Sequence, residues 1–266
     1  MPDGSAWPRI TIVTPSFDQG QFIEETIRSV LLQSYPNLEY IVIDGGSRDG
    51  SVDVIRAYAP WLAYWVSEPD RGQSHAINKG WAKATGRLWA WLNSDDLYLP
   101  GTLATIATVM HRDPAVRLAY GSALFVDEQG RFKFKYQGRP LRPGVLKMQY
   151  WLGWAVPQPT LFFDRSLVDQ YGPLDESYHY ALDYEWLLRV SRHVDFTCID
   201  ETLAVYRMHS QSKTGDWHST KSRFFIENAR ANRKHAPIWS PRAWPLWWAK
   251  LRYDATDFAR RHGLRR

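Results

Sequence analysis

An apolar run that ends in two acids carries the clearest chemistry in this sequence. Leu88 to Leu92 has the length of a buried strand, and Asn93-Ser94-Asp95-Asp96 follow it directly. In open α/β sheets, ligands bind beyond the carboxyl ends of the strands, and carboxylates placed there can hold a hard divalent cation together with phosphate oxygens. The alternative is that Asp95 and Asp96 only cap the helix that follows.

Two further acids stand where an expected strand ends or an expected helix begins. Asp44 follows the run Leu38 to Ile43 and precedes two glycines, which permit close backbone approach and positive φ. Asp44 can instead form a turn with its own loop. Asp183 stands near the start of a helical segment, where an acid can act as a general base or simply stabilise the helix N-terminus; Glu185 shares this turn and is the competing carboxylate.

The elements that would position these acids alternate in the first hundred residues. Strands are expected at 9–14, 38–43, 62–66 and 88–92, with helices between them at 23–31, 52–59 and 74–84. This order predicts an α/β fold with a mainly parallel, doubly wound sheet. In the second half we expect an α+β arrangement, with strands at 116–120, 124–126, 131–136, 160–163 and 196–208 and helices near 181–190 and at 221–234. The turn Asp127-Glu128-Gln129-Gly130 predicts a hairpin.

The composition is that of a globular protein with anionic partners. The 266 residues carry a net charge of +5, which favours nucleotide phosphates, nucleic acid or acidic lipid. The lone Cys198 excludes an internal disulfide and a Cys-rich zinc site. The sequence has neither an apolar run of about 18 residues nor a signal-peptide pattern at its N-terminus, so a cytoplasmic enzyme without a transmembrane helix is expected.

Six segments, in this order and at this spacing, resemble motifs of the family 2 glycosyltransferases, which are inverting enzymes with the GT-A fold. They are Thr14-Pro15-Ser16-Phe17, Ile43 to Ser51, Asp70 to Gly80, Asn93-Ser94-Asp95-Asp96, Leu182 to Trp186, and Tyr206-Arg207-Met208-His209. The resemblance covers about residues 9–214. Two positions depart from the family pattern: Asn93 replaces the first acid of the metal-binding DXD motif, and Leu182 replaces the Glu that often precedes the base.

The resemblance implies that a sugar is transferred, with inversion, from a UDP- or dTDP-sugar to a hydroxyl group. It implies that Asp183 is the general base and that Asp95 and His209 bind Mn²⁺ or Mg²⁺, with the imidazole favouring Mn²⁺. The residues expected to bind the nucleotide sugar are Thr14, Pro15, Ser16, Asp44, Arg71, Asn93, Ser94 and Asp95.

Three of these residues have expected partners. Asp44 would accept the ring N3–H of uracil or thymine, and Asn93 would orient a ribose hydroxyl. Arg71 would contact the base or a phosphate, unless it pairs with Asp70.

We expect a GT-A domain at 1–235, with a nucleotide-sugar half at 1–115 and an acceptor half at 116–235, followed by a Trp- and Arg-rich tail at 236–266. Four tryptophans of the tail lie among basic residues, a pattern that favours peripheral contact with anionic membrane and a lipid-linked acceptor. They are Trp239, Trp244, Trp247 and Trp248. Packing of these rings against the sheet or a second copy is the alternative. A glycan or lipid-linked acceptor would place the enzyme in polysaccharide or cell-envelope biosynthesis.

Two other classes share parts of this pattern. A sugar-phosphate nucleotidyltransferase would share the sheet and the metal, but the Gly-rich basic loop after the first strand is missing here. A non-catalytic nucleic-acid-binding protein fits the positive charge and the many aromatic residues. Acids at strand ends would repel phosphate without a metal, so no nucleic-acid partner is expected.

Overall fold

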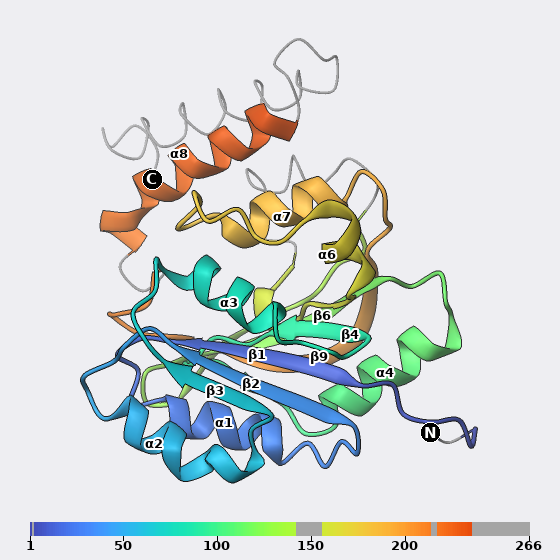
Figure 1. The fold of residues 1–266 in the computed structure, drawn as a ribbon. Coiled ribbons are helices and arrows are strands. Elements are labelled where there is room, and N and C mark those ends of the chain that lie inside the picture. Colours follow the sequence, from blue (N-terminus) through green and yellow to red (C-terminus); the bar gives the residue numbers. More distant parts are fainter. Residues whose placement is uncertain (2, 142–155, 214–216, 236–266) are drawn as a thin grey trace.

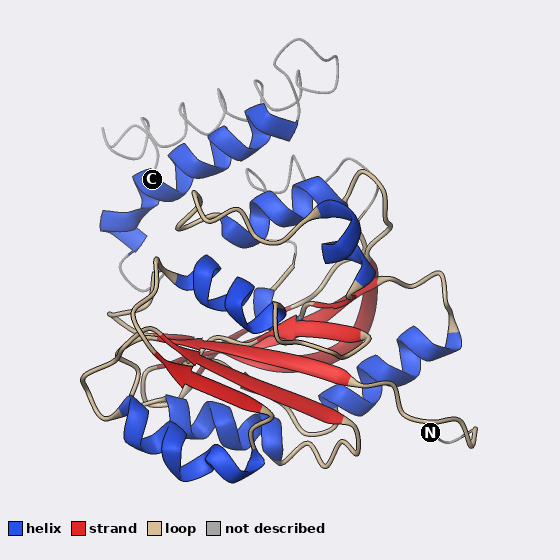
Figure 2. Ribbon diagram, viewed as in Figure 1, coloured by secondary structure: helices blue, strands red, loops and turns tan. Residues whose placement is uncertain are grey.

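The structure, a computed structural model, describes residues 1, 3–141, 156–213 and 217–235. Within these ranges nine strands form one sheet in the order β3-β2-β1-β4-β8-β6-β9-β5, with β7 beside β6. Helices cover both faces of this sheet (Figure 1, Figure 2). None of the helices in the described ranges is long and apolar enough to cross a membrane.

The first half is the parallel part of the sheet. Its elements are β1 (Ile10–Ser16), α1 (Ile23–Leu31), β2 (Leu38–Asp44), α2 (Ser51–Tyr58), a 3-10 turn (Ala59–Trp61), β3 (Tyr64–Ser67), α3 (Gln73–Trp81) and β4 (Leu88–Trp91). β1 pairs in parallel with β2 and with β4, and β2 pairs in parallel with β3. The carboxyl ends of these strands therefore meet at one edge, as the sequence pattern predicts.

Alternating side chains on β1 and β2 build a separate apolar core on each face of the sheet. Val13 and Ile41 pack on one face with residues of α3, and Ile12 and Val42 pack on the other with residues of α1. All four side chains are buried, which is the pattern of a central strand covered by helices on both sides. The two cores pack against both faces of the strands whose ends meet at this edge.

The second half continues the same sheet with mixed strand directions. Its elements are β5 (Leu97–Tyr98), α4 (Thr102–Arg112), β6 (Leu118–Asp127), β7 (Phe132–Tyr136), a 3-10 turn (Gln158–Thr160), β8 (Phe162–Asp164), α6 (Ser166–Tyr171), α7 (Leu182–Val190), β9 (Thr197–Met208) and α8 (Trp217–His235). β8 lies antiparallel between β4 and β6, and β9 lies between β6 and β5. Figure 1 shows α3, α6, α7 and α8 on one side of the sheet and α1, α2 and α4 on the other.

The structure confirms the α/β order and the hairpin. It also joins the two expected strands at 116–120 and 124–126 into the single strand β6, and it makes 197–208 one strand. β5 and α6 were not expected, because elements of two and six residues give too little periodicity to recognise. The tail at 236–266, with its four tryptophans, lies outside the described residues.

Candidate functional site

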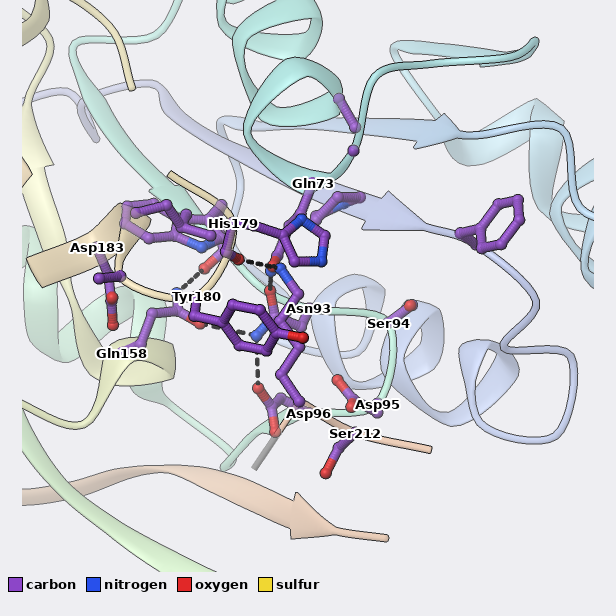
Figure 3. A pocket seen from close by; sticks show the side chains of 18 of the residues that line it. Gln73, Asn93, Ser94, Asp95, Asp96, Gln158, His179, Tyr180, Asp183 and Ser212 are labelled. Atoms are coloured by element: carbon purple, nitrogen blue, oxygen red, sulfur yellow. Dashed lines mark hydrogen bonds between the residues drawn. The ribbon is translucent and has the colours of Figure 1, made fainter. Parts of the chain in front are cut away.

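A cavity of about 710 Å³ lies at the carboxyl ends of β1, β2 and β4, and the segments before α7 and after β9 form its other walls. Figure 3 shows many of its side chains. Polar lining residues come from many separate segments of the chain, and they include Ser16 at the end of β1, Asp70 and Gln73 at the start of α3, Asn93 to Asp96 after β4, Gln158 in the 3-10 turn before β8, His179 to Asp183 at the start of α7, Ser212 and Lys213 after β9, and Asn228 in α8. The site is thus assembled from both halves of the chain.

Asp95 and His209 meet beside the cavity. Nε2 of His209 lies 2.9 Å from Oδ2 of Asp95, and the imidazole is buried against the ring of Phe22. Its Nδ1 has no hydrogen-bond partner among the described residues. The sequence prediction that these two residues lie together, 114 positions apart in the chain, agrees with this geometry.

This pair fits a divalent cation that is shared with a phosphate. A carboxylate oxygen and an imidazole nitrogen converge, and within the described ranges no third His, Cys, Asp or Glu joins them in a metal-binding group. Oxygens of a diphosphate and water would therefore have to complete the coordination, as they do at many Mg²⁺ sites.

Asp96 has a structural role in the same turn. It is buried, and its carboxyl accepts hydrogen bonds from the backbone N–H of Arg207 at 3.1 Å and from Asn93 at 3.2 Å. Burial, and then the charge of Asp95, raise the pKa of Asp96. The interpretation that these acids cap the next helix is wrong, because α4 begins after Gly101 without a side-chain cap.

The amide of Asn93 is engaged by protein groups on both sides. Gln73 donates to its Oδ1 at 2.6 Å, and its Nδ2 donates to Asp96 and, at 2.9 Å, to Oε1 of Gln158 (Figure 3). Lys213 extends the chain by donating to Oε1 of Gln73 at 2.7 Å. A carboxylate accepts hydrogen bonds but cannot donate them, so Asn93 is required here as an amide. The expected contact between Asn93 and a ribose hydroxyl would have to compete with these bonds.

Asp183 lies in the first turn of α7 with its carboxyl group in the cavity. Burial raises its pKa, and the N–H of Tyr184 donates to its Oδ1 at 2.7 Å. Figure 3 shows Asp183 and Asp95 on opposite sides of the cavity.

The competing carboxylate of Glu185 faces away from this cavity. It is fully buried and is bonded to Arg189, Lys234 and His235. Burial opposes its ionisation, but the hydrogen bonds from His235 and Lys234 outweigh burial and lower its pKa to about 2. Glu185 therefore ties α7 to α8 and does not reach the cavity.

Asp44 is not where the base-binding prediction needs it. Its side chain is fully buried and is outside the cavity lining. The carboxylate accepts the backbone N–H groups of Gly46 at 3.0 Å and Ser47 at 2.9 Å, together with the hydroxyls of Ser47 and Ser67. These are the bonds of the alternative interpretation, a turn in which Asp44 binds its own loop.

Two more residues predicted to bind the nucleotide sugar lie outside the lining. Thr14 is buried within β1, and its hydroxyl is 3.0 Å from that of Tyr40. Arg71 is exposed and pairs with Glu176 at 2.6 Å, so the alternative pairing with Asp70 is not formed either. The remaining predicted ligands, Pro15, Ser16, Asn93, Ser94 and Asp95, all line the cavity.

Asp70 is a site residue that the sequence reasoning considered only as a partner for Arg71. Its Oδ1 accepts the N–H of Gly72 at 2.6 Å, while Oδ2 has no hydrogen bond within the described part of the chain. A Cβ atom at Gly45 would stand 2.8 Å from this oxygen and 3.1 Å from the ring of Phe17. The glycine after Asp44 therefore makes room for the carboxylate of Asp70 in the cavity wall.

Lys213 was missed because no local pattern distinguishes it. Besides Gln73, its Nζ donates to the carbonyl oxygen of His179 at 2.6 Å. Burial lowers its pKa to about 8, against the opposing charges of Asp183, Glu227 and Asp95. Among the described lining residues it is the one lysine or arginine, in a cavity whose acids are Asp70, Asp95, Asp96 and Asp183.

Comparisons with known proteins identify the family of this chain. Residues 11–172 match the model of glycosyl transferase family 2. An uncharacterized glycosyltransferase of Mycobacterium tuberculosis is 32% identical over 189 residues, 69% of each chain. An uncharacterized glycosyltransferase of Rickettsia typhi is 25% identical over 214 residues, which cover 78% of this chain and 66% of the relative.

Two solved structures share the fold at low identity. The mannosyltransferase PcManGT from Pyrobaculum calidifontis, in complex with GDP-Man and Mn²⁺, has a TM-score of 0.63 at 22% identity and covers 96% of this chain and 76% of its own. Residues 1–349 of TarS from S. aureus, in complex with UDP-GlcNAc, have a TM-score of 0.62 at 14% identity and cover 88% of this chain and 72% of that one.

The family model spans the strands and loops from β1 to α6, including the carboxyl ends of β1, β2 and β4 at the cavity. A nucleotidyltransferase or a non-catalytic nucleic-acid binder is therefore no longer an alternative. The chain belongs to glycosyl transferase family 2, and it is a glycosyltransferase with a GT-A fold.

Proposed function

We propose that this protein is an inverting, metal-dependent glycosyltransferase that moves a sugar from a nucleoside-diphospho-sugar to a hydroxyl group of a glycan or a lipid-linked acceptor. The observation that carries the proposal is the pairing of two features in one cavity. The carboxylate of Asp183, with a raised pKa, stands on one side, and the Asp95–His209 pair stands on the other. The first suits a proton acceptor, and the second suits a diphosphate with its cation.

Asp183 is the general base of this proposal. It takes the proton of the acceptor hydroxyl as that oxygen forms a bond to the anomeric carbon, while the bond from this carbon to the diphosphate oxygen breaks. A raised pKa brings a carboxylate closer to the working pH, which strengthens it as a base. Because this scheme uses one displacement, the product has the opposite anomeric configuration to the donor.

The leaving diphosphate needs positive charge around it. Asp95 and His209 would hold Mn²⁺ or Mg²⁺, which stabilises the charge that develops on the diphosphate when it is bound. We also propose that the ammonium group of Lys213 stabilises this charge. Two hydrogen bonds to described residues hold this group, which has three N–H donors, and the third N–H can donate to the diphosphate of the donor substrate. Both contributions act in a cavity where charges interact more strongly than in water.

Asp70 takes the base-binding role that the sequence suggested for Asp44. An ionised carboxylate only accepts hydrogen bonds, so we propose that its Oδ2 accepts one from a ring N–H of the base. Uracil and thymine have one at N3, and guanine has one at N1, whereas the ring nitrogens of neutral cytosine and adenine have none. This supports UDP- or dTDP-sugars as donors and adds GDP-sugars, in line with the UDP-GlcNAc and GDP-Man complexes of the two structural neighbours.

For the acceptor and the cellular location, our proposals rest on the sequence. A cytoplasmic enzyme that contacts anionic membrane through residues 236–266 would meet a lipid-linked acceptor in polysaccharide or cell-envelope biosynthesis. A flotation assay with anionic liposomes tests the membrane contact.

A donor panel tests the function itself. UDP-, dTDP- and GDP-sugars are incubated with the protein, with Mn²⁺ or with excess EDTA, and release of the nucleoside diphosphate is measured. We expect release from at least one donor, dependent on the cation. Proton NMR of the product then gives its anomeric configuration, and retention would contradict the single displacement. Full activity in EDTA would contradict the assigned role of Asp95 and His209.

A further inference from the structure

Three consecutive backbone N–H groups just before α7 point at one carboxylate. The N–H of His179 lies 3.1 and 3.0 Å from the two carboxyl oxygens of Glu227, and those of Tyr180 and Ala181 donate to its Oε2 at 2.7 and 2.9 Å. Glu227 belongs to α8 and lies 46 to 48 residues after these three residues in the chain. The contact therefore joins the start of one helix to the side of another.

This contact lies immediately before a helix that has no side-chain cap. The N-cap residue of α7 is Ala181, which has no side chain able to accept a hydrogen bond, and no side-chain cap is present. Of the three N–H groups, that of Ala181 belongs to the helix terminus, where N–H groups have no partners within the helix and favour negative charge. A row of N–H groups that converge on an anion is a stable binding arrangement, and here the anion is a side chain of the protein.

The clamped segment carries three parts of the site. The side chains of His179 and Tyr180 line the cavity, and Asp183 follows two residues after Ala181. The carbonyl oxygen of His179 also holds Lys213 at 2.6 Å. A shift of this backbone would move the proposed base and the proposed leaving-group cation together.

The C-terminal end of α8 has its own attachment to α7. Lys234 donates to Glu185 and to Asp175, each at 2.9 Å, and His235 lies 2.7 Å from the carboxylate of Glu185. These contacts dock the helix without touching residues 179–181. They provide a comparison for a change at Glu227, because they hold the same helix at another point.

We propose that Glu227 is a positioning residue of the transferase reaction. Its carboxylate fixes the backbone at 179–181 so that Asp183 reaches the acceptor hydroxyl. The proposal rests on the proposed role of Asp183. It concerns a residue beyond the segment matched by the family model, which ends at 172.

The test uses Glu227→Gln, which keeps the size of the side chain but removes its charge and leaves one accepting oxygen. Turnover is measured as hydrolysis of the nucleotide sugar that the wild type hydrolyses fastest in the donor panel, with water as acceptor. Affinity for UDP, or for the diphosphate of that donor, is measured by calorimetry with Mn²⁺. We expect kcat to fall by roughly 10- to 100-fold, because small misplacements of a reacting group cost about that much, with a dissociation constant within about twofold of wild type.

Lys234→Gln is the matched control, since it loosens α8 without removing the clamp. We expect its kcat to stay within about twofold of wild type. An equal loss of kcat in both variants would show that helix docking alone matters, and it would overturn the proposal. So would a Glu227→Gln enzyme with normal kcat. If the wild type binds none of the diphosphates, the proposed function fails instead of this inference.

Amide hydrogen exchange of the wild type tests the proposal even if Glu227→Gln folds poorly. In the wild type the amides of residues 179–181 should exchange slowly, at a rate comparable with the amides inside α7. Fast exchange at 179–181 in the native protein would overturn the clamp. In a folded Glu227→Gln variant, protection should be weaker at 179–181 than in the wild type and unchanged inside α7, because an amide oxygen is a weaker acceptor than a carboxylate.

Discussion

Asp44 and Asp70 give opposite predictions that decide which acid binds the nucleotide. Asp44→Ala removes the acceptor of two backbone N–H groups and two hydroxyls. Each unpaired buried donor costs roughly 1–3 kcal/mol, and Gly46 and Ser47 are half-buried, so water can replace part of the loss. We therefore expect the free energy of unfolding to fall by about 2–4 kcal/mol, which is a large part of the roughly 5–15 kcal/mol of a typical domain.

Asp70→Ala should do the reverse. This carboxylate makes one hydrogen bond to the backbone, at Gly72, so the variant should lose at most about 1.5 kcal/mol of stability. Loss of a hydrogen bond between a base N–H and a charged acceptor costs roughly 1.5–3 kcal/mol of binding free energy. This corresponds to a dissociation constant for UDP that is about 10- to 150-fold larger. Asp70→Asn should lose the same bond while offering an N–H of its own, which makes CDP a better ligand relative to UDP.

The assays are urea unfolding followed by tryptophan fluorescence, and calorimetric titration of UDP and CDP into each folded variant with Mn²⁺ present. The reasoning would be refuted by an Asp44→Ala protein that is as stable as wild type but no longer binds UDP. It would equally be refuted by unchanged UDP affinity in Asp70→Ala.

Three further predictions concern the opposite sides of the cavity. Asp183→Asn should lower turnover by about 10²- to 10⁴-fold with UDP affinity unchanged. Because burial raises the folded-state pKa of Asp183 above its unfolded value, its ionisation costs stability as the pH rises through the folded pKa. Asp183→Asn should therefore melt at the same or a higher temperature at pH 8, and a clear drop in melting temperature would contradict this. Asn93→Asp, which recreates the acid of the DXD motif, should weaken the activation of turnover by Mn²⁺. The change removes the two hydrogen bonds that Asn93 donates and places a carboxylate next to that of Asp96. Stronger activation by Mn²⁺ would show that the hydrogen bonds of the amide are dispensable. Asp95→Ala should abolish turnover without unfolding, and His209→Ala should raise the Mn²⁺ concentration needed; an unchanged Mn²⁺ titration would leave His209 a structural residue.

The order of strands and helices up to β4 could be predicted from the sequence because the signals for these elements are local. Strand and helix periodicities alternate clearly up to β4, and the acids that follow β4 stand at a strand end whatever the rest of the chain does. Asp183 was placed in the first turn of α7 for the same reason. The motif order then brought His209 to Asp95, although nothing local connects them.

The remaining site residues depend on contacts that no local pattern encodes. Gln158 and Lys213 reach Asn93 and Gln73 only because the second half folds back onto the first. The choice between Asp44 and Asp70 depends on which carboxylate the loop serines satisfy, and both outcomes fit the same sequence. Glu227 gave no signal at all, because the N–H groups that donate to it lie 46 to 48 residues earlier, just before α7.

The position of β9 has a consequence for how this protein folds. β9 enters the sheet between β6 and β5, and its last residues precede His209, so the contact with Asp95 closes a loop of 114 residues. Contacts between residues so far apart form slowly, because the entropy of loop closure must be overcome before the contact contributes any stability. The parallel strands β1 to β4 can assemble from near neighbours, whereas the Asp95–His209 pair proposed to bind the metal must wait for almost the entire sheet. A chain in the course of refolding should thus recover its parallel sheet before it recovers any affinity for Mn²⁺ and nucleotide.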